Sequence, residues 1–108
     1  MPVDRATIAN LQFGLAQNAP NPFRNETQIH FTLPMQCSVK LAVYDVAGRQ
    51  VASLSNQVWE AGIHTLAWSG KTDNGSFARG GMYFVQLVAH ATAGNGQFRA
   101  QKSMIRIN

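Results

Sequence analysis

Apolar and polar residues alternate one by one along several short segments of this chain, and this period of two constrains the fold more than any other feature. In residues 27–33, Ile29, Phe31 and Leu33 fall on one face and polar residues on the other. The same alternation recurs in three further segments, residues 38–44, 63–69 and 82–90. Successive side chains of a β-strand point to opposite faces, so the pattern predicts strands with one buried face.

Turn signals separate these segments at intervals of about 8–12 residues. They are Ala19-Pro20-Asn21-Pro22-Phe23, Asp45–Gly48, Ala61-Gly62, the Gly-rich loop 70–81 and Ala93–Gly96. The sequence therefore predicts an all-β protein, an antiparallel immunoglobulin-like β-sandwich of about seven strands, with an antiparallel barrel as the alternative. We expect the strands at residues 13–18, 27–33, 38–44, 49–55, 63–69, 82–90 and 98–108.

The last of these strands has an imperfect period. Phe98 and Met104 share a phase that Ile105 and Ile107 do not. A bulge or a twist near Lys102-Ser103 would bring both sets onto the buried face, and we expect one there.

The length of 108 residues corresponds to one domain. We assign residues 13–108 to the sandwich and residues 1–12 to a linker or an added N-terminus. Residues 1–5 lack the apolar stretch of a signal peptide, and no segment is apolar over the length of a membrane span. We therefore expect no transmembrane segment, and we expect the chain to be a piece of a longer protein.

The composition argues against nucleic-acid binding. The net charge is +4, but the nine basic residues are dispersed and form no stripe with interleaved aromatics. Dispersed positive charge is compatible with weak contact to anionic glycans of the cell envelope. The single cysteine, Cys37, cannot form an internal disulfide, and we expect it to act as a small apolar residue.

The polar residues do not form a recognisable catalytic or metal-binding pattern. His30, His64 and His90 fall on three different expected strands, without metal-ligand spacing. Thr72-Asp73-Asn74-Gly75 lacks the spaced oxygen ligands of a calcium loop and is read as a turn. We therefore expect no enzyme activity, no metal and no cofactor.

The aromatic residues allow a carbohydrate-binding surface as one interpretation. Trp68 and Tyr83 lie in phase with aliphatic residues, which favours the core. Trp59, beside Glu60 in a loop-like stretch, is the best candidate for an exposed aromatic residue that stacks on a sugar.

Six motifs of the chain, taken in order, resemble the type A C-terminal sorting domain of the type IX secretion system. They also resemble the related Ig-like domain of flagellar hook-capping proteins. The motifs are residues 15–23 (LAQNAPNPF), 29–34 (IHFTLP), 43–51 (VYDVAGRQV), 61–64 (AGIH), 68–84 (from WSG to GMYF) and 102–104 (KSM). The resemblance covers residues 13–108, and one departure is an extra residue between Gly70 and Asp73.

The resemblance implies a seven-stranded sandwich that directs an attached N-terminal cargo domain through the periplasm to the outer-membrane surface or the exterior. Its implied partners are the secretion translocon and the surface-attachment machinery. The regions that we expect a translocon to read are the turn at 20–23, the turn at 45–49 and the last strand at 102–107. The residues expected to carry recognition or to maintain the fold are Pro20, Asn21, Pro22, Phe23, Tyr44, Asp45, Gly48, Arg49, Trp68, Gly81, Tyr83 and Lys102.

Two other functions stay open at this point. One is an accessory carbohydrate-binding module of a secreted protein, and the other is a structural Ig-like domain of a filament or hook-capping protein.

Overall fold

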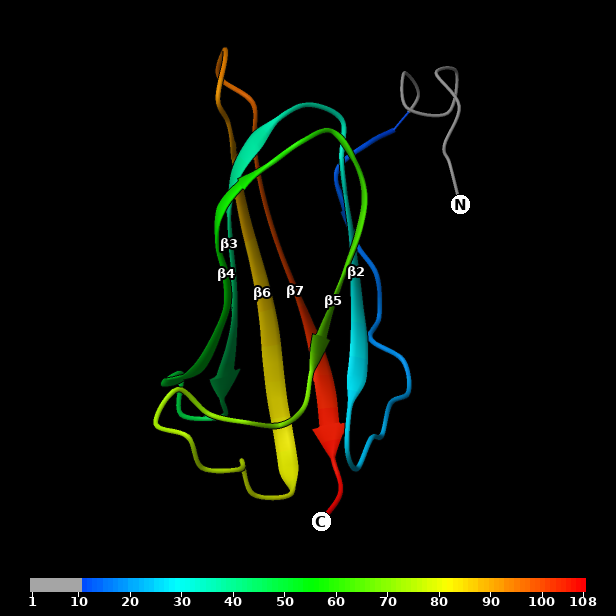
Figure 1. The fold of residues 1–108 in the computed structure, drawn as a ribbon, viewed down its shortest axis with the longest axis vertical. Helices are drawn as coiled ribbons and strands as arrows, with labels where there is room; N and C mark the ends of the chain where they lie inside the picture. The colour runs from blue at the N-terminus through cyan, green and yellow to red at the C-terminus, as the bar shows by residue number, and fades with distance from the viewer. Residues whose placement is uncertain (1–10) are drawn as a thin grey trace.

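The computed structural model describes residues 11–108, so most of the expected linker at 1–12 lies outside the described residues. These residues form seven strands in two layers (Figure 1). The strands are β1 (Gly14–Leu15), β2 (Thr27–Leu33), β3 (Cys37–Asp45), β4 (Gln50–Trp59), β5 (Gly62–Trp68), β6 (Gly81–Ala91) and β7 (Gln97–Arg106). The described residues include no helix of the length and apolarity that a membrane crossing requires.

One sheet has the strand order β1-β2-β5 and the other has the order β4-β3-β6-β7. Every pair of neighbouring strands is antiparallel. The expected immunoglobulin-like β-sandwich is therefore confirmed, in preference to the barrel.

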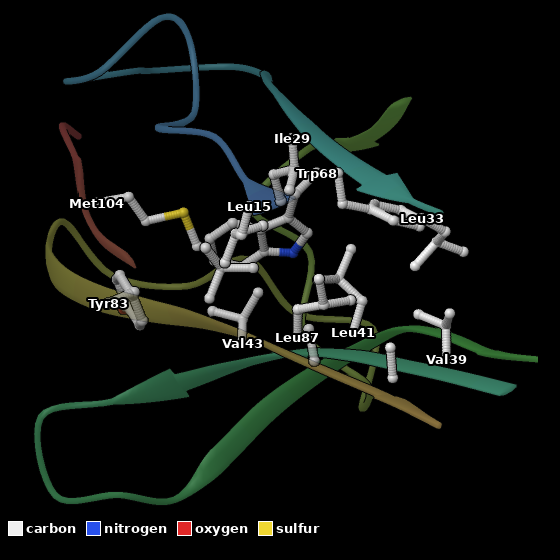
Figure 2. Close-up of a cluster of buried hydrophobic side chains, with 14 of the residues drawn as sticks. Leu15, Ile29, Leu33, Val39, Leu41, Val43, Trp68, Tyr83, Leu87 and Met104 are labelled. Atoms are coloured by element: carbon white, nitrogen blue, oxygen red, sulfur yellow. The ribbon is translucent and has the colours of Figure 1, made fainter. Parts of the chain in front are cut away.

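The core lies between the two sheets and is built by the alternation in the sequence. In β2, Ile29, Phe31 and Leu33 are buried while Gln28, His30 and Thr32 are only partly covered. Val39, Leu41 and Val43 of β3 face them, and Figure 2 shows these side chains pointing toward one another from the two layers. The burial of each large apolar side chain contributes about 1.5–3 kcal/mol, so the alternation itself determines which face of each strand turns inward.

The bulge expected in the last strand is absent. The pairing of β6 with β7 runs without a shift from Gly81↔Arg106 to His90↔Gln97, so no bulge is present near Lys102-Ser103. Ile105 is instead 42% exposed on the outer face. Single exposed apolar residues are common on protein surfaces, and they require no correction of the phase.

The strand expected at 49–55 is longer and less regular than its sequence suggests. β4 extends to Trp59, and its pairing with β3 shifts between Leu41 and Ala42 and again between Val43 and Tyr44. Each shift inserts an extra residue in β4 and reverses the phase of the side chains that follow. The expected strand at 13–18, by contrast, contributes only the two residues of β1.

Cys37 is fully buried at the start of β3, as expected of a small apolar residue. Its thiol donates a weak hydrogen bond to the Met35 carbonyl, 3.4 Å away. Burial raises the pKa of the Cys37 thiol above its ordinary value, because the charged thiolate would lose hydration.

We expect Cys37 to react with thiol reagents at least about a hundredfold more slowly in the native protein than in denaturant, because reaction requires the strand to open. The rate of labelling by iodoacetamide measures this directly. In a Cys37→Ser background, Ser38→Cys is the matched control, since residue 38 is exposed on the same strand and should label rapidly. Equal labelling rates for the two positions would contradict the burial of Cys37.

Candidate functional site

One end of the sandwich gathers segments that are far apart in the sequence. The turn at 20–23, the turn at 45–49, the loop at 70–80 and the last residues of β7 all lie at this end, which is the lower end in Figure 1. We call it the motif end, because most residues of the sorting-domain resemblance lie there.

The Pro-Asn-Pro-Phe segment lies along the edge of β7. The Phe23 backbone N–H donates to the Ile105 carbonyl at 3.0 Å, and the Ile107 N–H donates to the Phe23 carbonyl at 2.8 Å. The Asn21 side-chain oxygen accepts the N–H of Ile105 at 2.9 Å. Pro20 and Pro22, both after cis peptide bonds, lie exposed beside this pairing. The opening motif and the last strand are therefore one hydrogen-bonded unit.

Two buried polar side chains tie this segment together, and the sequence reading did not single them out. The Asn18 Nδ2 donates to the Thr27 hydroxyl at 2.9 Å, and that hydroxyl donates to the Pro20 carbonyl at 2.8 Å. Asn18 is 3% exposed and Thr27 is fully buried. Buried polar groups cost free energy unless they are hydrogen-bonded, so this pair selects one shape for the turn.

Three aromatic rings connect the motif end to the core. Phe23, which is 2% exposed, lies 5.7 Å from the Trp68 ring in a tilted arrangement. Trp68 in turn makes an edge-to-face contact with Tyr83 at 5.7 Å, and Figure 2 shows Trp68 between the two layers. The expected burial of Trp68 and Tyr83 is confirmed, and Phe23 is buried with them.

The loop at 70–80 is held by side chains from three different strands. The Trp68 indole N–H donates to the Lys71 carbonyl at 2.9 Å. The Tyr83 hydroxyl donates to the Arg79 carbonyl at 2.7 Å, and the Arg106 Nη1 donates to the Ala78 carbonyl at 2.6 Å. Hydrogen bonds within the loop close a small hairpin between Lys71 and Phe77. The loop is therefore a fixed part of the motif end.

Gly70 and Arg106 lie closer together than any residue with a side chain at position 70 would allow. Gly70 has a φ of 85°, a left-handed conformation that favours glycine. A β-carbon built there would overlap the Nε of Arg106. This Nε is buried and has no hydrogen-bond partner among the described residues. The missing side chain of Gly70 thus provides the space for the Arg106 guanidinium.

The turn at 45–49 is closed by the carboxylate of Asp45. Its Oδ1 accepts the backbone N–H groups of Ala47 and Arg49 at 2.9 and 3.0 Å, and its Oδ2 pairs with the Arg49 Nε at 3.0 Å. The hydrogen bond from the Arg49 N–H, assisted by the positive charge of Arg49, lowers the pKa of Asp45 below its ordinary value. Gly48, with a φ of 82°, completes the turn.

A hollow of about 570 Å³ opens on the motif end beside the last residues of β7. It is lined by Arg24, Asn25, Phe77, Ala78, Arg79, Arg106, Ile107 and Asn108. Three guanidinium groups therefore border it, and none of its lining residues is acidic. Phe77 is 65% exposed at its rim, an aromatic residue that the sequence reading did not select. Such a combination favours a partner that carries carboxylate or phosphate groups.

None of the site residues predicted from the sequence lines this hollow. Tyr44 is half-buried on the outer face of the β4-β3-β6-β7 sheet, opposite Phe84 of β6. Lys102 lies farther along β7, opposite Val85. Gly81 begins β6 with a φ of 152°. The structure thus gathers most of the predicted residues at the motif end but places none of them in the lining of the hollow.

Trp59 is not the exposed aromatic residue that the sequence suggested. It is half-buried at the end of β4, where its ring makes an edge contact with Phe31 at 5.5 Å and lies 4.8 Å from His64. Its indole N–H donates to the Ser55 hydroxyl at 2.9 Å. This packing removes most of the ring from any sugar-stacking role.

The residues around Asp73 form the expected turn. The Gly75 N–H donates to the Thr72 carbonyl at 3.0 Å, and the Asp73 Oδ1 accepts the N–H of Ser53 in β4 at 2.9 Å. Within the described part of the chain, no three His, Cys, Asp or Glu side chains gather as metal ligands would. The turn therefore anchors the loop to β4.

We expect Gly70→Ala to destabilise the fold by about 1.5–3 kcal/mol more than Gly75→Ala. Both positions have a positive φ, but only at position 70 would a methyl group displace a neighbour. That neighbour is the Arg106 guanidinium, whose hydrogen bond to the Ala78 carbonyl would then be lost. Denaturant unfolding of the two variants measures the difference. In an Arg106→Ala background the excess cost of Gly70→Ala should vanish, and equal costs in the wild-type background would refute the contact.

We expect the Asp45 turn to lose stability in acid. The pKa of Asp45 is lower in the folded protein than in the unfolded chain, so its contribution is present above the unfolded pKa and disappears as pH falls through the folded pKa. Unfolding free energies measured between about pH 5 and pH 2 should fall less in Asp45→Asn than in the wild type. Arg49→Ala keeps the backbone donor, so an NMR titration should show the Asp45 pKa rising only partway toward its ordinary value.

Comparisons with known proteins agree with this architecture. The family model of the FlgD Ig-like domain matches residues 9–94, which is most of the chain. The fold is shared with part of the dimeric latent PorU from Porphyromonas gingivalis, with a TM-score of 0.68 and 19% sequence identity. That match covers 90% of this chain and 10% of the PorU chain. No curated protein matches the sequence. The chain is a member of the FlgD Ig-like domain family.

Proposed function

We propose that this domain is a non-catalytic sorting and anchoring module that directs an attached cargo protein through the type IX secretion system. The cargo would pass through the periplasm to the outer-membrane surface or the exterior. The proposal rests first on the ordered set of motifs that resemble type A sorting domains, and on membership of the related FlgD Ig-like family.

The observation that carries the proposal is the convergence of these motifs at the motif end. The residues of the opening Pro-Asn-Pro-Phe motif, the Trp68 motif and the last strand contact one another through hydrogen bonds and ring contacts. Antiparallel strands place every second turn of a sandwich at the same end, but a stable sandwich does not require these turns to be joined by hydrogen bonds and ring contacts beside an arginine-bordered hollow. A surface that another protein reads does require a fixed arrangement of this kind.

The size relationship with PorU supports a role as an attached module. The fold corresponds to about a tenth of that chain, so the same architecture occurs there as a small part of a much longer protein. A cargo protein joined to this domain would likewise be a longer chain in which this fold forms one part.

The hollow is the part of the motif end that we assign to recognition. It includes Arg106 and Ile107 of the expected region at 102–107, and Arg24 and Asn25, which directly follow the expected turn at 20–23. The guanidinium groups would bind acidic groups of the partner, and the exposed Phe77 would supply apolar contact.

Export of a fused reporter tests the function. The chain is joined to the C-terminus of a periplasm-competent reporter in a type IX host, and the reporter is measured in the periplasm, at the surface and in the medium. We expect surface and extracellular reporter with the wild-type domain. Retention of the reporter in the periplasm would contradict the proposed function.

A pair of charge-reversal variants tests the hollow. Arg24→Glu with Arg79→Glu should reduce export about tenfold, since like charges would then face the partner. Lys40→Glu with Arg99→Glu makes the same change in net charge on exposed strand residues away from the hollow, and should export normally. Thermal unfolding confirms that both variants fold. Equal export by the two variants would keep the sorting function and remove the hollow from recognition.

The carbohydrate-binding alternative is weakened by the packing of Trp59 against Phe31 and His64. A weak contact of the arginines with anionic glycans is compatible with the sorting role. Pull-down of the isolated domain by neutral polysaccharides distinguishes the two functions, since a carbohydrate-binding module that stacks on sugars should be retained and a sorting module that contacts glycans only through its arginines should not.

A further inference from the structure

The two sheets have four edges, and in the described residues three of them are protected against pairing with another strand. β1 is only two residues long. The lower part of β7 is covered by the backbone of Phe23 and the side chain of Asn21, and the strand carries Arg99, Lys102 and Arg106. β4 has two irregularities, and Asp73 bonds to its backbone at Val51 and Ser53. Short strands, charges, bulges and covering loops are the means by which proteins protect sheet edges.

The fourth edge, β5, has none of these protections. Its sequence is Gly-Ile-His-Thr-Leu-Ala-Trp, without a charged residue or proline. Its pairing with β2 runs over all seven residues without a shift, so the strand is regular. No backbone hydrogen bond from another described segment reaches residues 63–67 along the outer edge.

The hydrogen bonds of β2 show which groups of β5 are free. Gln28 exchanges two backbone hydrogen bonds with Ala19, and the His30 carbonyl accepts the N–H of Ala16, all on the side away from β5. Backbone groups alternate in direction along a strand, so Ile29 and Phe31 are the residues that bond toward β5. Their partners are Leu66 and His64. The backbone groups of Ile63, Thr65 and Ala67 therefore point outward from the sheet.

The side chains of the same three residues are exposed on the outer face, with Ile63 50% accessible. An antiparallel pair of two β5 strands centred on Thr65 would use all three sets of free backbone groups. Ile63 of each copy would face Ala67 of the other, an apolar contact, and Thr65 would face Thr65. Cross-strand pairs of this kind stabilise antiparallel sheets.

The charges beside β5 favour this arrangement over a parallel one. Glu60 precedes the strand and Lys71 follows it, and both are exposed. Antiparallel pairing brings Glu60 of one copy toward Lys71 of the other at both ends of the strand. Parallel pairing would place like charges together.

We propose that β5 is a self-association edge, through which two copies of this domain join the β1-β2-β5 sheets into one continuous six-stranded sheet. The contact is isologous, because each copy presents the same strand to the other. It is small and touches the motif end only at Lys71, and no residue of β5 lines the arginine-bordered hollow, so the hollow of both copies stays free. The proposal stands independently of the sorting function.

Sedimentation equilibrium of the full chain, from about 10 μM to about 1 mM, tests the association over the range of weak contacts. We expect a concentration-dependent monomer–dimer equilibrium. Amide hydrogen exchange at Ile63, Thr65 and Ala67 should slow as the dimer forms. A monomer over the whole range would overturn the proposal.

A charge-swap pair tests the register. Ile63→Lys with Ala67→Lys should raise the dimer dissociation constant at least about tenfold, because like charges would face each other twice. Ile63→Lys with Ala67→Glu should restore dimerisation, because each lysine would then face a glutamate. Gln97→Lys with Gln101→Lys places the same two charges at the same spacing on exposed positions of β7, and should leave the equilibrium unchanged.

Disulfide formation gives a second, geometric measurement. In a Cys37→Ser background, Thr65→Cys should cross-link to itself under mild oxidation, since directly opposed residues have the separation that a disulfide requires. Ser38→Cys should not. A dimer that is insensitive to the charge swap, or that leaves Cys at position 65 unlinked, would refute pairing through β5. Protection of the three amides that depends on another protein, and not on the chain's own concentration, would overturn a second copy as the occupant.

Discussion

The indole of Trp68 is the contact on which the motif end depends. The ring of Phe23 contacts the indole and so brings the opening segment to the core. Tyr83 reaches it from β6, and the indole N–H holds the loop through the Lys71 carbonyl. The opening segment, β6 and the loop between β5 and β6 therefore share one side chain. A partner that recognises the motif end reads an arrangement that exists only while the core is intact.

This coupling explains why fold maintenance and recognition use the same motifs. Phe23, Trp68 and Tyr83 are buried and cannot be touched by a partner, yet they position the exposed prolines and the loop. The exposed Arg24 and Arg79 at the hollow, by contrast, can be changed without removing a buried side chain. The buried residues supply the shape, and the rim residues supply the chemistry, so the two roles separate at the level of individual side chains.

The regular strands could be predicted from the sequence because burial of one face imposes a period of two. β2 was located to the residue, and the inward residues of β6 were identified. β4 was predicted poorly because its two irregularities reverse the alternation of inward and outward side chains. Without a regular alternation, the stretch around Trp59 resembles a loop in the sequence. The bulge was predicted wrongly on the basis of Ile105, because an apolar residue on the outer face cannot be distinguished in sequence from one that a bulge displaces.

The site was predictable only where the family resemblance supplied motifs. The sequence offers no signal that Arg106 extends beneath the loop or that Gly70 makes room for it, because these residues are far apart in the sequence and meet only in the folded protein. The same is true of Asn18 and Thr27, whose pairing becomes visible only once the turn between them is closed. Long-range contacts between polar side chains carry no periodicity, so pattern analysis does not find them.

The pairing of Phe23 with β7 has a consequence for the order of events during synthesis. The segment that opens the sandwich is made before β2, but its backbone partners at Ile105 and Ile107 are made only after the other six strands. The motif end therefore cannot assemble on a chain that stops within the domain. Any machine that recognises this end would engage the domain only after all seven strands have been made.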